Sequence, residues 1–209
     1  MRKKVIKNII FDFGGVLIDW NPDYVFKKLI KNKTDRDFFY NNICTFDWNE
    51  NQDMGYPLKK ATRERIKLFP EYEKLILAYY GRWEEMLGGE ISGTVKILNT
   101  IYQKEKFKLL GLTNWSSETF PIALKRFKFL RLFSGIVVSG EEKTRKPFKK
   151  IYQLITDRYN LNCDETVFID DNLRNINAAI NFGIKKSILF KNPENLEADL
   201  KKLKILWST

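Results

Sequence analysis

The chain has 209 residues and 44% of them are hydrophobic, which allows one α/β domain of ordinary size with a modest insertion and excludes a disordered or fibrous protein. Its formal charge of +11 comes from basic residues spread along the whole sequence without a long basic run, which favours a solvated surface over a nucleic-acid-binding face. Because histidine is absent, Ser-His-Asp and Cys-His mechanisms and histidine-ligated metal sites are excluded, and any chemistry must rely on carboxylates, lysine and hydroxyls.

Strand-like and helix-like segments alternate along most of the chain. Short runs rich in Val, Ile, Leu and Phe are typical of strands in a parallel sheet that helices cover on both faces. The predicted strands are residues 5–11, 107–112, 135–139, 166–169 and 187–190. The predicted helices are residues 93–102, 118–127, 149–159, 176–182 and 193–203. This alternation predicts βαβ units and an α/β fold with a doubly wound, Rossmann-like parallel sheet.

The interval from residue 20 to residue 88 interrupts this alternation, because it is rich in aromatic residues, biased toward helix and without a convincing strand. Apolar residues recur at helical spacing in three segments, residues 22–31, 58–69 and 72–87, which the polar run 49–53 and Pro70 separate. Gly88 and Gly89 are expected to end the last helix and return the chain to the sheet. We therefore predict a small inserted α-helical domain at 20–88 and an α/β core domain at 1–19 and 89–209.

Polar residues follow the first two predicted strands, at the positions where ligands of open α/β sheets bind. Asp12 comes directly after the first strand, and Gly14 and Gly15 then allow a tight turn and a close approach of the backbone to a ligand. Thr113 and Asn114 follow the second strand. These residues are the first candidates for a site.

Two further motifs carry charge. Lys146 lies in a basic cluster at residues 143–147, and the adjacent acids Asp170 and Asp171 follow the fourth predicted strand. Taken singly, each of the four motifs is equally compatible with a helix cap, a loop or ordinary surface. The acid pair is harder to explain in this way, because like charges so close raise each other's pKa unless a cation or basic group offsets them.

Together the four motifs form one chemical set. Asp12, one of the pair Asp170 and Asp171, and a backbone carbonyl of the Asp12 loop are the oxygen ligands that a hard cation such as Mg²⁺ prefers. The cation and Lys146 would neutralise a bound phosphoryl group, while Thr113 and nearby backbone N–H groups donate to its oxygens. A carboxylate oxygen of Asp12 can then attack phosphorus or carbon and form a covalent intermediate that water hydrolyses.

In this order, the motifs resemble those of the haloacid dehalogenase-like hydrolases, and the resemblance covers essentially the whole chain. It implies that Asp12 is the nucleophile and a metal ligand, that Thr113 binds phosphate and that Lys146 stabilises charge. It also implies that Asp170 and Asp171 are the acidic pair of a magnesium site. The helical insertion then corresponds to the small mobile cap of this family, which closes over the site and selects the substrate.

The same resemblance indicates the remaining contacts and the substrate class. We expect the backbone carbonyl of Gly14 to bind the metal, and Gly15 and Asn114 to contact the phosphate. Residues 11–20, 112–116, 138–142 and 168–172 resemble a bacterial subgroup that includes sugar-phosphate phosphatases similar to α-D-glucose-1-phosphatase. The expected substrate is a small anionic phosphate monoester, with a sugar phosphate favoured.

Position 14 departs from the pattern of the family's phosphatases, which carry a second aspartate there that protonates the leaving group and then activates water. This chain has Gly14 instead, and Asp19 or a cap residue such as Asp53 is the candidate replacement, unless a good leaving group needs little help. The departure keeps open a 2-haloacid dehalogenase, which needs neither the acid nor the metal. Against that reading, the acid pair suits a metal and no arginine lies near Ile43, where dehalogenases place a halide-binding residue.

Two other functional classes share features with this sequence. Response-regulator receiver domains carry acids, a Thr or Ser and a Lys at strand ends, but their acidic pair comes first in the chain and here it comes last. A catalytically silent binding protein is compatible with the missing aspartate and the basic charge. Five aromatic residues of the insertion are expected to form its core rather than a sugar pocket, namely Trp20, Phe46, Trp48, Tyr56 and Trp83.

Partners and location follow from what the sequence lacks. No apolar run approaches the roughly 20 residues that a membrane-spanning helix needs, and the start of the chain leads into a short strand-like segment. We therefore expect a cytoplasmic protein with neither a membrane nor a nucleic acid as a partner. The two cysteines, Cys44 and Cys163, lie far apart and outside any CxxC pattern, which argues against a disulfide framework or a thiolate zinc site.

Overall fold

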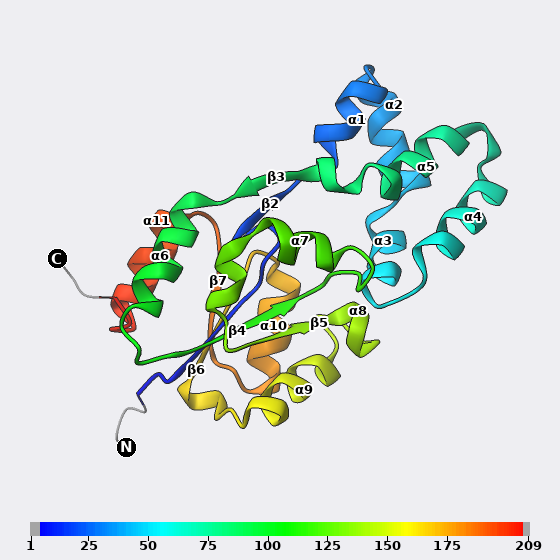
Figure 1. Cartoon of the computed structure of the whole chain (residues 1–209). Helices are drawn as coiled ribbons and strands as arrows, with labels where there is room; N and C mark the ends of the chain where they lie inside the picture. The colour runs from blue at the N-terminus through cyan, green and yellow to red at the C-terminus, as the bar shows by residue number, and fades with distance from the viewer. Residues whose placement is uncertain (1–4, 207–209) are drawn as a thin grey trace.

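The computed structural model describes residues 5–206 and is built around a five-stranded parallel sheet with the strand order β5-β4-β1-β6-β7 (Figure 1). The strands are β1 (Asn8–Phe11), β4 (Lys108–Thr113), β5 (Gly135–Val138), β6 (Thr166–Asp170) and β7 (Lys186–Leu189). The chain leaves β1 toward β4 and β5 on one side and returns to β6 and β7 on the other. This order confirms the predicted doubly wound α/β fold.

Helices cover both faces of the sheet, and the side chains of β1 alternate between the two faces. Ile10 belongs to a buried cluster with α9 (Lys149–Tyr159) and α10 (Leu173–Phe182). Ile9 and Phe11 belong to a second, larger cluster that includes α6 (Ser92–Tyr102) and α11 (Pro193–Lys202). Because successive side chains of a strand point to opposite faces, burial on both sides requires the continuous apolar run seen in this strand.

Most predicted elements of the sheet and its helices are present, with differences at their ends. Helix α9 has the predicted bounds, whereas α10 begins three residues earlier than predicted, because the Asn172 side chain accepts a hydrogen bond from the Arg174 N–H at 2.9 Å and caps it. Helix α7 (Phe120–Arg126) lies within the predicted helix 118–127, and the connections also contain three short helices that the sequence does not predict, η4 (Lys128–Leu132), α8 (Ser139–Glu142) and η5 (Cys163–Glu165).

The segment between β1 and α6 holds a helical bundle at the end of a two-stranded stem (Figure 1). The stem pairs β2 (Ile18–Trp20) with β3 (Leu87–Glu90) in antiparallel fashion. The helical elements between them are α1 (Asp23–Leu29), α2 (Lys33–Phe38), η1 (Phe39–Ile43), α3 (Phe46–Asp53), α4 (Leu58–Leu68), η2 (Pro70–Tyr72), α5 (Glu73–Gly81) and η3 (Trp83–Met86).

Two expectations for this segment are wrong. Gly88 and Gly89 lie within β3 instead of ending a helix, so the segment does contain a strand at its end. The predicted helix 72–87 is divided into α5 and η3, with Arg82 between them. Both strands of the stem are short, and each includes a charged residue or glycines in place of an apolar run, which removes the periodic signal of a strand.

The polar run 49–53 is also not a separator, because it forms most of α3. The Thr45 side chain begins this helix by accepting a hydrogen bond from the Trp48 N–H at 3.1 Å. Asn49 and Gln52 are buried, and each bonds to the hydroxyl of Tyr80, at 3.0 and 3.1 Å. Polar side chains are buried here because they have polar partners, which apolar periodicity cannot detect.

The predicted division into a core domain at 1–19 and 89–209 and a cap domain at 20–88 stays a prediction. Its outer ends, residues 1–4 and 207–209, lie outside the described residues. Within residues 5–206, no helix has the length and apolar character of a membrane span.

Candidate active site

The carboxyl ends of β1, β4 and β6 meet at one edge of the sheet and bring the predicted motifs together. In the parallel register, Phe11 of β1 lies beside Gly111 of β4 and Ile169 of β6. The next residues along β1 and β6 are Asp12 and Asp170, so the two carboxylates leave the sheet at the same level.

Lys146 joins these two carboxylates. Its side chain is 0% exposed, and its ammonium group lies 2.8 Å from Asp12 Oδ1 and 2.7 Å from Asp170 Oδ2. It also donates to the backbone carbonyl of Leu112 at 2.9 Å. A buried ammonium is stable here because all of its partners are acceptors and two of them carry charge.

The site nevertheless carries an excess of negative charge. Burial raises the pKa of Asp12 well above its usual range, Lys146 offsets only part of this, and the charges of Asp170 and Asp171 raise it further. Burial and the charge of Asp170 also raise the pKa of Asp171. Burial acts to lower the pKa of Lys146, but its two carboxylate partners outweigh that effect and raise it. Three carboxylates beside one lysine form an environment that a divalent cation would neutralise.

The geometry of the three carboxylates fits a metal ion. Asp12, Asp170 and Asp171 each offer an oxygen, and these oxygens lie within 4.8 Å of one another. Both oxygens of Asp170 are already used, since they accept from Lys146, from the Asn172 N–H at 2.8 Å and from the Asn175 amide at 3.0 and 3.1 Å. Asp171 is therefore the member of the pair that can turn its oxygens to a cation.

The loop after Asp12 leaves room for Asp171. Gly15 has φ +73°, in the left-handed region, and a Cβ atom at Gly15 would lie 2.2 Å from Asp171 Oδ2. The Gly15 N–H donates to the Ile18 carbonyl at 2.9 Å and closes the turn. Glycine at this position thus forms a cradle for the acidic group, which supports the predicted metal site.

Thr113 is the last residue of β4 and Asn114 follows it, and their side chains differ in their hydrogen bonds. Thr113 is 1% exposed, and its hydroxyl has no hydrogen-bond partner among residues 5–206. An unpaired buried hydroxyl is costly, so a ligand oxygen is its natural partner. Asn114 instead donates its amide to the Lys146 carbonyl and accepts from the Lys146 N–H, both at 2.9 Å. It positions Lys146, and direct contact of Asn114 with phosphate stays a prediction.

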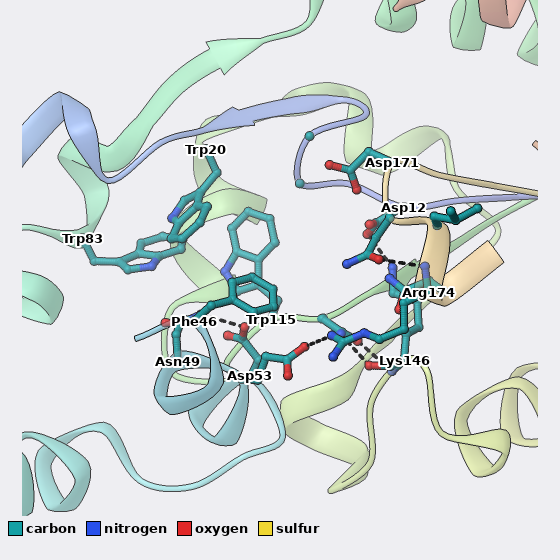
Figure 2. Close-up of a pocket in the computed structure, with 17 residues that line it drawn as sticks. Asp12, Trp20, Phe46, Asn49, Asp53, Trp83, Trp115, Lys146, Asp171 and Arg174 are labelled. Atoms are coloured by element: carbon teal, nitrogen blue, oxygen red, sulfur yellow. Dashed lines mark hydrogen bonds and ion pairs between the residues drawn. The ribbon is translucent and has the colours of Figure 1, made fainter. Parts of the chain in front are cut away.

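A cavity of about 430 Å³ opens above these groups. Figure 2 shows Asp12, Asp171 and Lys146 on one side of it and aromatic rings on the other. The predicted site residues that line it are Asp12, Gly14, Gly15, Asn114, Lys146 and Asp171, whereas Thr113 and Asp170 are buried at the strand ends.

The aromatic side of the cavity combines the insertion with the core. Trp20, Phe46 and Trp83 line it together with Trp115 from the loop after β4, and the rings of Trp83 and Trp115 meet edge to face at 5.4 Å (Figure 2). These three residues of the insertion therefore face a cavity, although packing was expected for them. Trp48 packs in the insertion against Tyr79 and Tyr80, and the Tyr56 hydroxyl donates to Glu64 at 2.7 Å.

An ion-pair network that sequence reasoning missed closes another side of the site. Glu50 of α3 is 3% exposed and pairs with both Arg145 and Arg174. Arg145 lies in the basic cluster that the sequence singled out, and Glu50 lies in the polar run 49–53. Nothing in one sequence shows that residues so far apart would pair.

Comparison with known proteins agrees with this arrangement. Residues 9–188 match the family of haloacid dehalogenase-like hydrolases. The chain belongs to this family. The match spans the sheet, the helical insertion and all four motifs, and it confirms the family predicted from their order.

Two curated relatives are fungal proteins. Drimenol cyclase drtB of Aspergillus calidoustus is 24% identical over 198 residues, which are 94% of this chain but 36% of that protein, so the chain spans about a third of it. Sesquiterpene phosphatase astK of Aspergillus oryzae is 26% identical over 193 residues, which cover 83% of this chain and 84% of that protein.

A solved structure shows the shared fold. An HAD family enzyme of Bacteroides thetaiotaomicron, in complex with magnesium and inorganic phosphate, has a TM-score of 0.68 and 23% identity to this chain. The likeness covers 90% of this chain and 95% of that one. These three proteins do not confirm the expected likeness to the sugar-phosphate phosphatases.

Proposed function

We propose that this hydrolase is a magnesium-dependent phosphatase that cleaves a phosphate monoester of a small metabolite through a covalent phosphoryl group on Asp12. The setting of Asp12 is the observation that carries the proposal. Its Oδ1 accepts from the Phe13 N–H at 2.7 Å and contacts Lys146 at 2.8 Å, while Oδ2 has no hydrogen-bond partner within residues 5–206. A carboxylate fixed through one oxygen and open at the other is arranged as a nucleophile.

The proposed metal site consists of Asp12, Asp171 and the backbone carbonyl of Gly14, with Asp170 behind them. The crowding of three carboxylates within 4.8 Å and the cradle at Gly15 both support it. When bound, magnesium supplies positive charge to the phosphoryl oxygens. The related Bacteroides enzyme that binds magnesium and phosphate in its crystal structure has the same fold, which agrees with this assignment.

The chain's own residues perform the remaining steps. The Asp12 carboxylate attacks phosphorus, the bond to the ester oxygen breaks, and water later cleaves the phosphoryl group from Asp12. Lys146 balances the charge of the carboxylates and of the phosphoryl oxygens, and the unpaired Thr113 hydroxyl donates to one of these oxygens. Asn114 keeps Lys146 in place through its backbone.

The aromatic side of the cavity is the proposed place of the organic part of the ester. Trp20, Trp83 and Trp115 offer flat apolar faces on which a sugar ring stacks, so sugar phosphates are the first substrate class to test. The same rings suit an isoprenoid chain. The likeness to a sesquiterpene phosphatase makes isoprenoid monophosphates the second class.

Phosphate release measured over sugar phosphates, nucleotides and isoprenoid monophosphates tests the proposal. We expect turnover of at least one ester with Mg²⁺, loss of turnover with EDTA and recovery when Mg²⁺ is returned. Asp12→Asn should abolish turnover while the protein stays folded, because the amide keeps the shape but is no nucleophile. The control is Asp37→Asn, an exposed residue of α2 that pairs with Lys33 and should turn over like the native protein.

Two outcomes would select other functions. Chloride release from 2-chloropropionate without metal, together with inactivity on every phosphate ester, would identify a dehalogenase, for which no leaving-group acid is needed. Tight, salt-sensitive binding to nucleic acid without any turnover would identify a binding protein. Full activity of Asp12→Asn on phosphate esters would rule out the proposed nucleophile.

A further inference from the structure

The proposed reaction lacks a proton donor next to the nucleophile. When an alkyl phosphate is cleaved, its alcohol part leaves as an unstable alkoxide unless a positioned acid protonates the ester oxygen. Position 14 holds glycine, and a Cβ atom there would meet nothing within 4 Å, apart from its chain neighbours. Open space therefore remains where a side chain at this position would start, and the acid must come from elsewhere.

Asp53, the last residue of α3, lines the same cavity as Asp12 and Lys146 (Figure 2). Its carboxylate accepts from the Asn49 amide at 2.9 Å, and its backbone carbonyl accepts from the hydroxyl of Ser139, the first residue of α8, which directly follows β5. The insertion thus places this carboxyl group against the edge of the sheet at which Asp12 lies.

The surroundings of Asp53 suit a group that exchanges protons near neutral pH. Burial raises the pKa of Asp53 to about 7 and the charge of Glu50 adds to this, while the Ser116 N–H and Arg145 lower it in part. Tyr79 and Tyr80 of α5 also face Asp53, and both stay uncharged because burial raises their pKa. At neutral pH, protonated and ionised forms of Asp53 are both populated, as acid and base roles require.

The other acidic residues near the cavity are committed to other partners. Among the described residues that line it, Asp12 and Asp171 belong to the metal cluster and Glu50 is paired with two arginines. Asp19, the other candidate from the sequence, accepts a hydrogen bond from the Tyr24 hydroxyl and is not among the lining side chains of residues 5–206.

The geometry points to Asp53 as the catalytic acid and base of this site, an assignment that rests on the proposed phosphatase function. The proton donor then comes from the insertion and not from position 14 of the Asp12 loop. In the first step Asp12 bonds to phosphorus, the bond to the ester oxygen breaks, and that oxygen takes the proton of Asp53. In the second step the Asp53 carboxylate takes a proton from water, the water oxygen bonds to phosphorus, and the bond to Asp12 breaks. Asp53 is then protonated again and Asp12 is free.

The first turnover on two esters tests this assignment with the full chain and Mg²⁺. 4-Nitrophenyl phosphate has a leaving group that departs without a proton, whereas glycerol 2-phosphate, or the alkyl ester cleaved fastest in the screen, needs one. We expect Asp53→Asn to slow the first turnover of the alkyl ester by about 100-fold or more and that of the aryl ester only a few-fold. Asp47→Asn, an exposed aspartate of the same helix, is the matched control and should keep both rates.

A rescue variant separates catalysis from folding. Gly14 does not have a positive φ and has open space beside it, so Gly14→Asp is tolerated by the backbone. Added to Asp53→Asn, Gly14→Asp should restore a large part of the alkyl-ester rate by supplying the acid from the Asp12 loop.

Three results would overturn the assignment. They are an equal loss on both esters, an unchanged alkyl-ester rate in Asp53→Asn, and the absence of any rescue by Gly14→Asp. Each of them leaves the phosphatase function intact if the native protein is active and Asp12→Asn is not. A native protein inactive on every phosphate ester removes the proposed function itself, and the role of Asp53 with it.

Discussion

Atom Oε2 of Glu50 lies 2.7 Å from Nη2 of Arg145, and this ion pair links α3 to the loop that carries Lys146. The Arg145 guanidinium also donates through Nη1 to the Lys146 carbonyl at 2.9 Å. One buried carboxylate therefore ties the insertion to the backbone of the residue that balances the charge of Asp12. Such a contact holds the insertion at the edge of the sheet at which the predicted motifs meet.

Glu50→Gln should destabilise the protein. The neutral glutamine cannot offset the positive charge of Arg145. Removing one partner of a buried ion pair lowers the free energy of unfolding by about 3 kcal/mol, because the other charge stays buried and unpaired. Urea unfolding measures this change. Glu197→Gln is the control, because its partner Lys201 lies one turn away on the exposed side of α11 and surface pairs contribute little. Equal shifts in the two variants would show that Glu50 adds no more than a surface pair.

The sheet and the loop that carries Asp12 could be predicted because their signals are local. A buried parallel strand leaves a continuous apolar run, and Asp12 and Asp170 follow such runs directly. The ends of parallel neighbours lie at one edge, so their convergence follows from the fold class alone.

The cavity wall could not be predicted because its signals are not local. Helix α3 buries Asn49, Glu50 and Gln52, which lack the apolar spacing that marks a helix. The position of Asp53 at the cavity depends on the contact of α3 with Ser139, which is 86 residues away in the chain. One sequence does not contain the pairing information that would place it there.

Gly15→Ala should weaken magnesium binding more than it weakens the fold. The added Cβ would overlap Asp171 Oδ2 at 2.2 Å, and alanine disfavours the left-handed backbone at φ +73°, so Asp171 must move. Mutation of a residue that orients a metal ligand typically lowers the affinity for the metal by about 10- to 100-fold. Calorimetric titration with Mg²⁺ measures it. Gly81→Ala, where a Cβ meets nothing within 4 Å and φ is not positive, should bind Mg²⁺ like the native protein, and the same affinity in both variants would contradict the proposed cradle.

The stability of the metal-free protein should depend on pH through Asp53. Its pKa is about 7 in the folded protein and near 3.8 in the unfolded chain, so the folded state binds the proton more tightly. The free energy of unfolding therefore falls as pH rises between these values, by at most about 1.4 kcal/mol per pH unit from this group, and levels off above pH 7.

Urea unfolding in EDTA of the native protein and of Asp53→Asn isolates that contribution. Asp12 and Asp171 also have raised pKa values and act in the same direction, but they are present in both proteins. We expect the native curve to fall more steeply than the variant curve from about pH 4 to about pH 7, and the two to run parallel above it. Parallel curves throughout would mean that Asp53 titrates at its ordinary pKa.

Thr113→Val should separate stability from ligand binding. The hydroxyl of Thr113 is buried without a partner within residues 5–206, so replacing it with a methyl group of similar shape should leave the free energy of unfolding unchanged or raise it. A hydrogen bond to a charged oxygen contributes about 1.5 to 3 kcal/mol, so the affinity for inorganic phosphate in the presence of Mg²⁺ should fall by about 10-fold or more. Thr94→Val is the matched control, because the Thr94 hydroxyl is also buried and unpaired within residues 5–206 but lies on α6 and not at the carboxyl end of β4. If both variants keep the phosphate affinity of the native protein, the Thr113 hydroxyl does not contact the phosphoryl group; if only Thr113→Val loses it, that orphaned donor belongs to the anion site.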